Sequence, residues 1–210
     1  MKRRPFVNFS GIAAPLPLNN INTDAIIPAQ YLRTSNADLA HGLFACWRYK
    51  DDDAEIPDFI LNRPGFRNAK IILGGENFGC GSSREAAVWA LVRFGIKAVF
   101  APSFADIFYE NAFRNGLLAG IVTRDDLACA LSLMGNDSMH SGFYVDLVAG
   151  TLTGRDCKAL HFFVPTFRRD ALMRGDDDIT ATLRLENYIE TFMADDRIRR
   201  PWIYNTGLKP

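Results

Sequence analysis

The stretch from residue 69 to 122 alternates short apolar runs with helical segments, and this order constrains the fold more than any other feature of the sequence. The first two apolar runs end at Gly74 and at Pro102, as buried strands commonly do. The expected strands are residues 71–73, 98–101 and 117–122, and the expected helices are residues 83–94 and 103–116. Strand–helix–strand–helix–strand with short connections indicates a parallel sheet layered with helices, so the predicted fold class is α/β.

The flanking parts of the chain are less regular. Up to about residue 67 the sequence is rich in Pro, Asn, Asp and Gly, which predicts short strands and long loops. Beyond residue 124 the expected elements are a helix at 125–134, a strand at 143–148 that pairs with one at 159–164, and helices at 166–174 and 185–194. A length of 210 residues fits a single domain over 1–210, with residues 195–210 as an extended tail.

The charge balance argues against several classes of protein. Lys and Arg total 24, as do Asp and Glu, so the formal net charge is zero and a nucleic-acid-binding role is not expected. The basic start of the chain is not followed by an apolar stretch, and no run approaches the roughly 18 apolar residues of a membrane span. We therefore expect a soluble, cytoplasmic protein.

The cysteines and histidines are too scattered to predict a metal site. The four cysteines lie far apart and form no C-x-x-C pair, and the three histidines are equally dispersed. Zinc and iron–sulfur sites usually draw on closely spaced Cys or His ligands. We therefore expect no metal-binding residues within this chain, and any metal chemistry would come from a partner.

The densest chemical signal is the glycine-rich loop (residues 74–85), with the sequence GGENFGCGSSRE. Its glycines allow tight turns and a close approach to a ligand. Ser82 and Glu85 have the spacing of a capping box, which predicts that the loop runs directly into a helix N-terminus. Such a terminus attracts anions, and the guanidinium of Arg84 matches a carboxylate. These residues predict a cradle for a carboxylate or a phosphate.

Other interpretations of the same loop remain open. Ser82 or Ser83 can serve only as a helix cap, and a purely structural loop explains the composition equally well. The lysine of a P-loop is absent, and no histidine is placed for a nucleophile elbow. Cys80 beside a helix N-terminus is an alternative candidate as an activated thiolate, although such a cysteine more often only fills space.

Two further segments have ordinary structural explanations when each is considered alone. The Asn-Thr-Asp segment (residues 20–28, NINTDAIIP) places Asp24 where a turn residue commonly bonds to its own backbone. The Pro-Ser-Phe segment (residues 101–108, APSFADIF) fits a strand, a stop and a helix capped by Ser103, with Asp106 three residues on.

Taken together and in this order, the three segments resemble the small subunits of the 3-isopropylmalate dehydratases, in the aconitase C-terminal swivelling-domain family. The Trp47-Arg48 pair and the segment from Phe167 to Ile179 are similar as well, so the resemblance extends from about Gly11 to Phe192. It implies a swivelling β/β/α domain whose sheet is partly parallel, as in the aconitase C-terminal domain.

The resemblance also implies a reaction and a partner. These enzymes isomerise 2-isopropylmalate and 3-isopropylmalate, hydroxy-dicarboxylates of leucine biosynthesis, by removing water and adding it back in the other orientation. A [4Fe–4S] cluster on a separate large subunit acts as the Lewis acid, so this chain would be active only as part of a heterodimer or higher assembly. By their match to the family motifs, the resemblance implies two catalytic residues: Ser82 as the base, and Asp24 as an acidic residue near the site that orients the loop. Arg84, Ser83 and Arg33 would bind the substrate.

Two departures from the family pattern leave alternatives open. Ala86 and Val88 stand where the family usually has His and Pro, and Asp176 replaces a residue that is more often apolar. One alternative is a related small subunit for another 2-hydroxy acid, such as a homoaconitate-like or citramalate-like substrate. The other is a non-catalytic subunit that only binds its partner, which Ser82, Arg84 and Asp24 argue against.

Overall fold

The computed structural model describes residues 5–33, 38–82, 84–134, 141–155 and 159–204. Strands are β1 (Asn8–Leu16), β2 (Ile71–Gly74), β3 (Ala98–Ala101), β4 (Leu118–Ile121), β5 (Gly142–Asp146), β6 (Thr151–Gly154) and β7 (Leu160–His161). Longer helices are α4 (Glu85–Phe94), α5 (Asp106–Arg114), α6 (Arg124–Met134), α7 (Thr166–Arg174), α8 (Asp178–Leu183) and α9 (Glu186–Arg199). The short helical turns are α1 (Thr23–Ile26), η1 (Ala29–Leu32), α2 (Leu39–Gly42), α3 (Ala45–Arg48), η2 (Ile60–Asn62), η3 (Pro64–Phe66) and α10 (Pro201–Tyr204).

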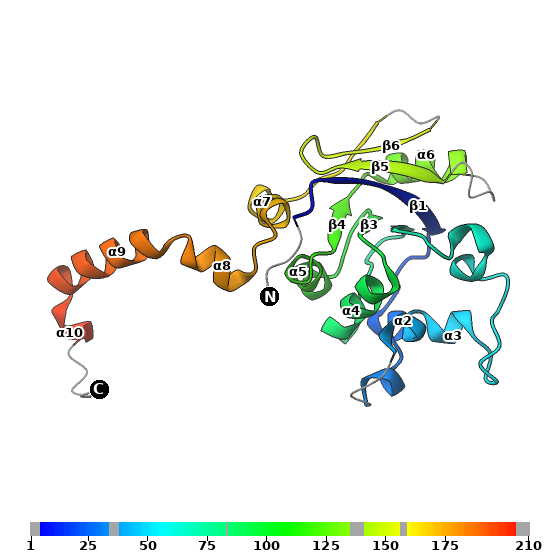
Figure 1. The fold of residues 1–210 in the computed structure, drawn as a ribbon, viewed down its shortest axis with the longest axis horizontal. Coiled ribbons are helices and arrows are strands. Elements are labelled where there is room, and N and C mark those ends of the chain that lie inside the picture. The colour runs from blue at the N-terminus through cyan, green and yellow to red at the C-terminus, as the bar shows by residue number, and fades with distance from the viewer. Residues whose placement is uncertain (1–4, 34–37, 83, 135–140, 156–158, 205–210) are drawn as a thin grey trace.

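The described strands form one sheet in the order β4-β3-β2-β1-β5-β6-β7 (Figure 1). The strands β1 to β4 run parallel, with Ala13 beside Ile71, Ile71 beside Ala98 and Ala98 beside Leu118. The three expected strands of this half and the two helices between them are confirmed, and the fold is α/β as predicted. Gly95 ends α4 with a φ of 111°, a left-handed conformation that glycine adopts at little cost.

The other half of the sheet is antiparallel and corrects one pairing. The strand β5 pairs with β1, which the pattern of residues 143–148 predicted only as a half-buried strand. The segment expected at 159–164 does not pair with β5. Its two-residue strand, β7, pairs instead with β6, a strand of four residues that was not predicted from the sequence, and Phe163 bridges to Ile121 of β4. Four residues are too few for an alternating pattern to stand out.

The expectation for the N-terminal part was wrong in one respect. Residues 8–16 form a nine-residue strand at the centre of the sheet, where short strands were expected. Its second half is largely buried and pairs in parallel with β2, while its first half pairs antiparallel with β5, so polar and apolar residues need not alternate along the whole strand. Most of the remainder, up to residue 67, folds as short helical turns.

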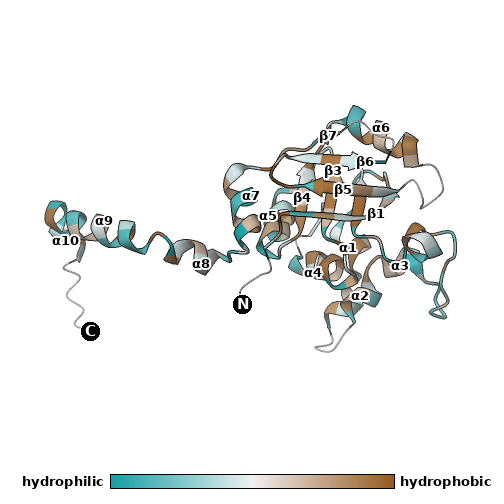
Figure 2. Cartoon of the chain, turned by 45° about the horizontal axis from the view of Figure 1, so that its top comes forward, coloured by the Kyte–Doolittle hydropathy of each residue, from teal (hydrophilic) through white to brown (hydrophobic). Residues whose placement is uncertain are grey.

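Helices α4 and α5 lie side by side, with α1 and α2 packed against α4 (Figure 1). The inner face of α4 is formed by Ala87, Val88, Ala90 and Leu91, all inaccessible to solvent. Figure 2 shows the apolar ribbon concentrated in the strands, and α6 lies near β5 and β6, away from α4 and α5. Val88 and the nearly buried Ala86, which replace the family Pro and His, are therefore core residues.

The C-terminal helices α8, α9 and α10 form an arm that extends away from the body of the molecule (Figure 1). Residues 197–202 had no clear period in the sequence, yet α9 continues to Arg199 and α10 begins at Pro201. An extended tail was expected at residues 195–210, whereas the arm leaves the body at α8. No helix in the described part of the chain is both long enough and apolar enough to cross a membrane.

Candidate functional site

The glycine-rich loop and the two other segments meet at one edge of the sheet. The loop follows β2, the Asn-Thr-Asp segment follows β1, and the Pro-Ser-Phe segment begins at the end of β3. These three strands are parallel neighbours, so their carboxyl ends lie together at the same edge. Ligands of open parallel sheets commonly bind at this edge.

Backbone hydrogen bonds join the Asn-Thr-Asp segment to the glycine-rich loop along its length. The Asn20 N–H donates to the Glu76 carbonyl at 2.8 Å, and the Gly79 N–H donates to the Ile21 carbonyl at 2.7 Å. Further along, the Thr23 N–H donates to the Cys80 carbonyl at 2.9 Å. The two segments, more than fifty residues apart in sequence, are therefore held in a fixed register.

The Pro-Ser-Phe segment supports the loop from its other side, and this corrects the predicted role of Ser103. The Ser103 hydroxyl accepts the Asn77 N–H at 2.8 Å, and its carbonyl accepts the Phe78 N–H at 3.1 Å. The helix α5 begins at Asp106 without a side-chain cap. Ser103 therefore binds the glycine-rich loop instead of capping the helix that follows it.

The glycines of the loop are required by close packing. Gly79 has a φ of 78°, and a Cβ at this position would lie 2.1 Å from Cγ of Phe108. A Cβ on Gly75 would lie 2.5 Å from the Leu18 carbonyl oxygen. Phe78 between them is fully buried, with its ring edge-on to the ring of Phe108 at 5.4 Å. The loop is thus a rigid, packed structure.

Arg84 and Asp24 face each other across the junction of the two segments. Nη1 of Arg84 lies 2.6 Å from Oδ1 of Asp24, with the arginine side chain 24% exposed and the aspartate 53% exposed. This nitrogen is buried and its contact lacks the alignment of a hydrogen bond. Asp24 is available for this ion pair because Asn22 caps α1, accepting the Ala25 N–H at 2.7 Å. The expected turn role therefore belongs to Asn22.

Ser82 lies exposed just before α4, and it does not form the predicted capping box. The helix begins at Glu85, with Arg84 at the N-cap position and no cap hydrogen bond from the Arg84 side chain. The Ser82 carbonyl accepts the Thr23 hydroxyl at 2.6 Å, which anchors the backbone and leaves the serine side chain exposed. Ser83, the other candidate serine, lies outside the described residues.

Glu85 bonds to Asn115 instead of closing a capping box. Its carboxylate accepts Nδ2–H of Asn115 at 2.9 Å, and Oδ1 of Asn115 accepts the indole N–H of Trp89 at 3.1 Å. Asn115 follows α5 and so ties the first turn of α4 to the neighbouring helix. Asn115 was not predicted from the sequence, because a lone Asn after a helix carries no local signal, and Thr23 was named only as part of the Asn-Thr-Asp segment.

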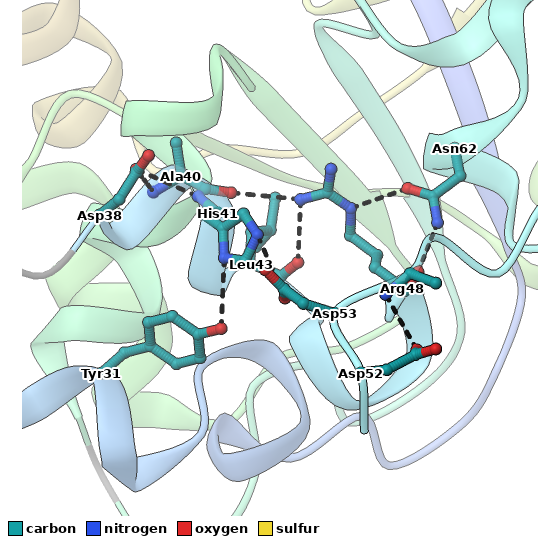
Figure 3. A network of polar contacts seen from close by, with 10 residues as sticks. Tyr31, Asp38, Ala40, His41, Leu43, Arg48, Asp52, Asp53 and Asn62 are labelled. Atoms are coloured by element: carbon teal, nitrogen blue, oxygen red, sulfur yellow. Dashed lines mark hydrogen bonds and ion pairs between the residues drawn. The ribbon is translucent and has the colours of Figure 1, made fainter. Parts of the chain in front are cut away.

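Arg33 is exposed, and a polar network connects the two helical turns on either side of it (Figure 3). The Tyr31 hydroxyl lies 3.3 Å from Nδ1 of His41, which links η1 to α2. Nε2 of His41 lies 3.5 Å from the Asp53 carboxylate. Residues 34–37, between the two turns, lie outside the described part of the chain. The structure thus joins the two ends of the segment that carries Arg33.

Arg48, noted above in the Trp47-Arg48 pair, extends the same network on the side opposite Tyr31 (Figure 3). Its side chain is buried and donates to Oδ1 of Asn62 at 3.0 Å and to the Ala40 carbonyl at 3.2 Å. Burial lowers its pKa, because an apolar environment disfavours the charged guanidinium. Arg48 therefore positions α2 rather than reaching the carboxyl edge of the sheet.

The described residues contain no group of three or more His, Cys, Asp or Glu arranged to bind a metal ion. Cys46, Cys80 and Cys129 are free and belong to three different elements, and Cys157 is outside the described residues. Among the described groups at this edge are the Arg84–Asp24 pair and the first turn of α4, next to the exposed Ser82. This set suits a carboxylate ligand.

Comparisons with a family model, with sequences and with a solved structure all match the same family. The family model of the aconitase C-terminal domain matches residues 3–124. A protein of Azorhizobium caulinodans named "3-isopropylmalate dehydratase small subunit" is 45% identical over 199 residues, covering 94% of this chain and 98% of that protein. One of the same name from Sinorhizobium medicae is 48% identical over 200 residues, with the same two coverages. The crystal structure of 3-isopropylmalate dehydratase from Methanocaldococcus jannaschii is similar at 31% identity and a TM-score of 0.63, covering 89% of this chain and 99% of that one.

The hydrogen bond from Thr23 to the Ser82 carbonyl yields a direct test of the site's construction. Thr23→Val keeps the shape of this buried residue and removes the donor, so the free energy of unfolding should fall by about 1 kcal/mol. Hydrogen exchange of the amides around residues 80–82 should accelerate. Thr23→Ser keeps the hydroxyl and should show little acceleration, and equal exchange in Thr23→Val and the native protein would refute the anchoring role.

Proposed function

The chain belongs to the aconitase C-terminal domain family, and from this premise we propose that it is the small subunit of a 3-isopropylmalate dehydratase. The protein is then a hydro-lyase subunit of leucine biosynthesis, acting with a large subunit. The observation that carries the proposal at the level of the site is the convergence of the three segments at one edge of the sheet.

The reaction sets requirements that this chain meets in part. Removing water from a 2-substituted malate requires a base that abstracts the proton from the carbon next to a carboxylate. It also requires an acid that assists the departure of hydroxide, which is a poor leaving group. In the proposed assembly a [4Fe–4S] cluster of the large subunit supplies Lewis acidity for the hydroxyl group. The described residues of this chain offer the complementary parts, namely a hydroxyl and an anion-binding arginine at the start of a helix.

Arg84 is the proposed substrate clamp. Its guanidinium presents a planar set of donors, which matches a carboxylate in two-point geometry. The ion pair with Asp24 fixes the direction of the side chain, and the buried Nη1 has no aligned hydrogen bond of its own. Asp24 is therefore proposed as the residue that orients Arg84, and Ser83 as a further substrate contact by its place in the motif.

Ser82 is the proposed base. A neutral serine hydroxyl is a weak base, so Ser82 can accept the substrate proton effectively only as the alkoxide, and that negative oxygen must be stabilised by nearby groups. The first turn of α4, which the Arg84 side chain does not cap, and the charge of Arg84 provide such stabilisation. The bond between the Ser82 carbonyl and Thr23 holds the backbone while the side chain stays accessible to a ligand.

Arg33 belongs to the segment that we propose faces the variable group of the substrate. Isopropylmalate carries an apolar branch there, whereas a homoaconitate-like substrate carries a further carboxylate. Burying an unpaired guanidinium against an isopropyl group costs several kcal/mol, because the charge loses its hydration. Pairing the guanidinium with a carboxylate is favourable. The exposed position of Arg33 supports isopropylmalate over the tricarboxylate.

Substitution of the serine tests the assignment of the base. In the assembled enzyme, Ser82→Ala should lower kcat by roughly 10²–10⁴-fold, because the proton acceptor is removed. Subunit assembly, followed by size-exclusion chromatography, should stay unchanged. Cys80→Ala is the matched control two residues away and should keep most of the activity. A dead Cys80→Ala beside an active Ser82→Ala would replace this mechanism with one based on the thiolate.

Substrate preference tests the role of Arg33. The assembled native enzyme should show a higher kcat/KM for isopropylmalate than for a tricarboxylate, and Arg33→Val should leave that order in place. The reason is that an arginine directed to solvent does not select for a carboxylate on the variable group. A native preference for the tricarboxylate that collapses in Arg33→Val would instead establish the homoaconitate-like alternative.

A further inference from the structure

The arm (α8–α10) exposes far more apolar surface than a free helix normally retains. Ten large apolar side chains between residues 179 and 203 are exposed. On α9 they form a stripe of Leu185, Tyr188, Ile189, Phe192 and Met193, whose spacing of three and four residues places them on one face. Tyr188 is 77% exposed and Phe192 is 62% exposed, so the body of the molecule leaves this face uncovered.

A buried carboxylate fixes the root of the arm. Asp176, between α7 and α8, accepts Nε–H of Arg174 at 2.8 Å and Nη2–H of Arg184 at 3.0 Å. These bonds, the one from Arg174 foremost, lower the pKa of Asp176. Asp177 caps α8 through the Thr180 N–H at 2.7 Å, and the bonds from Thr180 lower its pKa to about 2. The arm therefore leaves the body in a defined direction.

A second carboxylate fixes the tip. Asp196 accepts Nε–H of Arg200 at 2.6 Å and the Tyr204 hydroxyl at 2.9 Å, which folds α10 back against the end of α9. The bond from Arg200 holds the pKa of Asp196 below its ordinary value. Root and tip are thus both ordered by arginine–aspartate bonds, while the face between them is apolar and uncovered. An ordered arm loses less conformational entropy on binding than a flexible tail would.

We propose that the arm is a docking element for the large subunit, with the stripe of α9 seated in an apolar groove of that partner. The inference rests on the proposed function. The exposed apolar side chains of the arm present on the order of 1,000 Å². This matches the roughly 800 Å² per partner that a stable interface buries. A helix that inserts apolar anchors at i, i+3, i+4 and i+7 is a common form of groove recognition, and the stripe has this spacing.

The extent of the matched relatives favours the large subunit over a second copy of this chain. An alignment that covers 94% of the chain includes α8 and most of α9 wherever it begins. These relatives are named small subunits, and a small subunit implies a large subunit as its partner. The arm can also bind the large subunit without occupying the site. The site is proposed at the carboxyl edge of the sheet, whereas the arm lies on the far side of α7 (Figures 1 and 2).

The test is the affinity of the full-length chain for its large subunit. Tyr188→Glu/Phe192→Glu places two charges in the stripe, and Asn187→Glu/Ala194→Glu places the same two charges on the opposite, exposed face of α9. The stripe variant should raise the Kd at least about 30-fold, as the loss of central aromatic anchors does. The control should change it by less than about threefold. The melting temperature of the isolated chain should stay unchanged in both, because neither pair packs against the body.

Turnover at saturating small subunit separates docking from chemistry. The stripe variant should recover the native kcat once enough of it is added, since the residues of the site are intact. Equal Kd values for the stripe variant and the native chain, with an active native complex, would overturn the docking role alone. A complex that forms through the arm but converts no isopropylmalate would overturn the proposed function alone. Light scattering tests whether a second copy of this chain covers the stripe instead. If the native chain alone is a dimer, and the stripe variant is a monomer that still binds the large subunit normally, the proposal is wrong.

Discussion

Parallel pairing of β1 with β2 is the interaction on which the site depends. It brings the ends of the two strands together, and the chain segments that follow continue the pairing by backbone hydrogen bonds, from Asn20 to Glu76 and from Thr23 to Cys80. Arg84 and Asp24 come into contact only because this register is maintained. The tight packing of Gly79 on Phe108 adds the third segment, so a shift at any one of the three would displace the other two.

The parallel half of the fold was predictable because its signals are local. Apolar runs ended by Gly or Pro, and a helix ended by Gly95, depend on neighbouring residues only. The central strand β1 and the short β6 were missed, since their stability comes from partners distant in sequence. The capping roles of Ser82 and Ser103 failed for the same reason: their spacing was right, but a carbonyl and a hydroxyl found longer-range partners in Thr23 and Asn77. The identity of the site residues came from motif resemblance, and no local rule predicts the ion pair of Arg84 with Asp24.

The two ends of the molecule have different proposed roles, one in the active site and the other in binding the large subunit. At the carboxyl edge of the sheet, the loop presents the exposed Ser82 and leads to Arg84, whose Nη1 is buried beside Asp24 without an aligned hydrogen bond. At the other end, an ordered arm presents apolar surface. Both features are costly for an isolated protein, the first through unmet polar groups and the second through exposed hydrophobic area. Each becomes favourable once a partner covers it, which explains why one chain retains both.

The central claim is that this chain holds half of an active site, and complementation under anaerobic conditions tests it most directly. The isolated chain, the isolated large subunit and an equimolar mixture would each be assayed for hydration of 2-isopropylmaleate. The account predicts activity in the mixture alone, with iron retained by the large subunit when the two are separated again. Activity of the isolated chain, or a stoichiometric iron–sulfur cluster bound to it, would contradict the account.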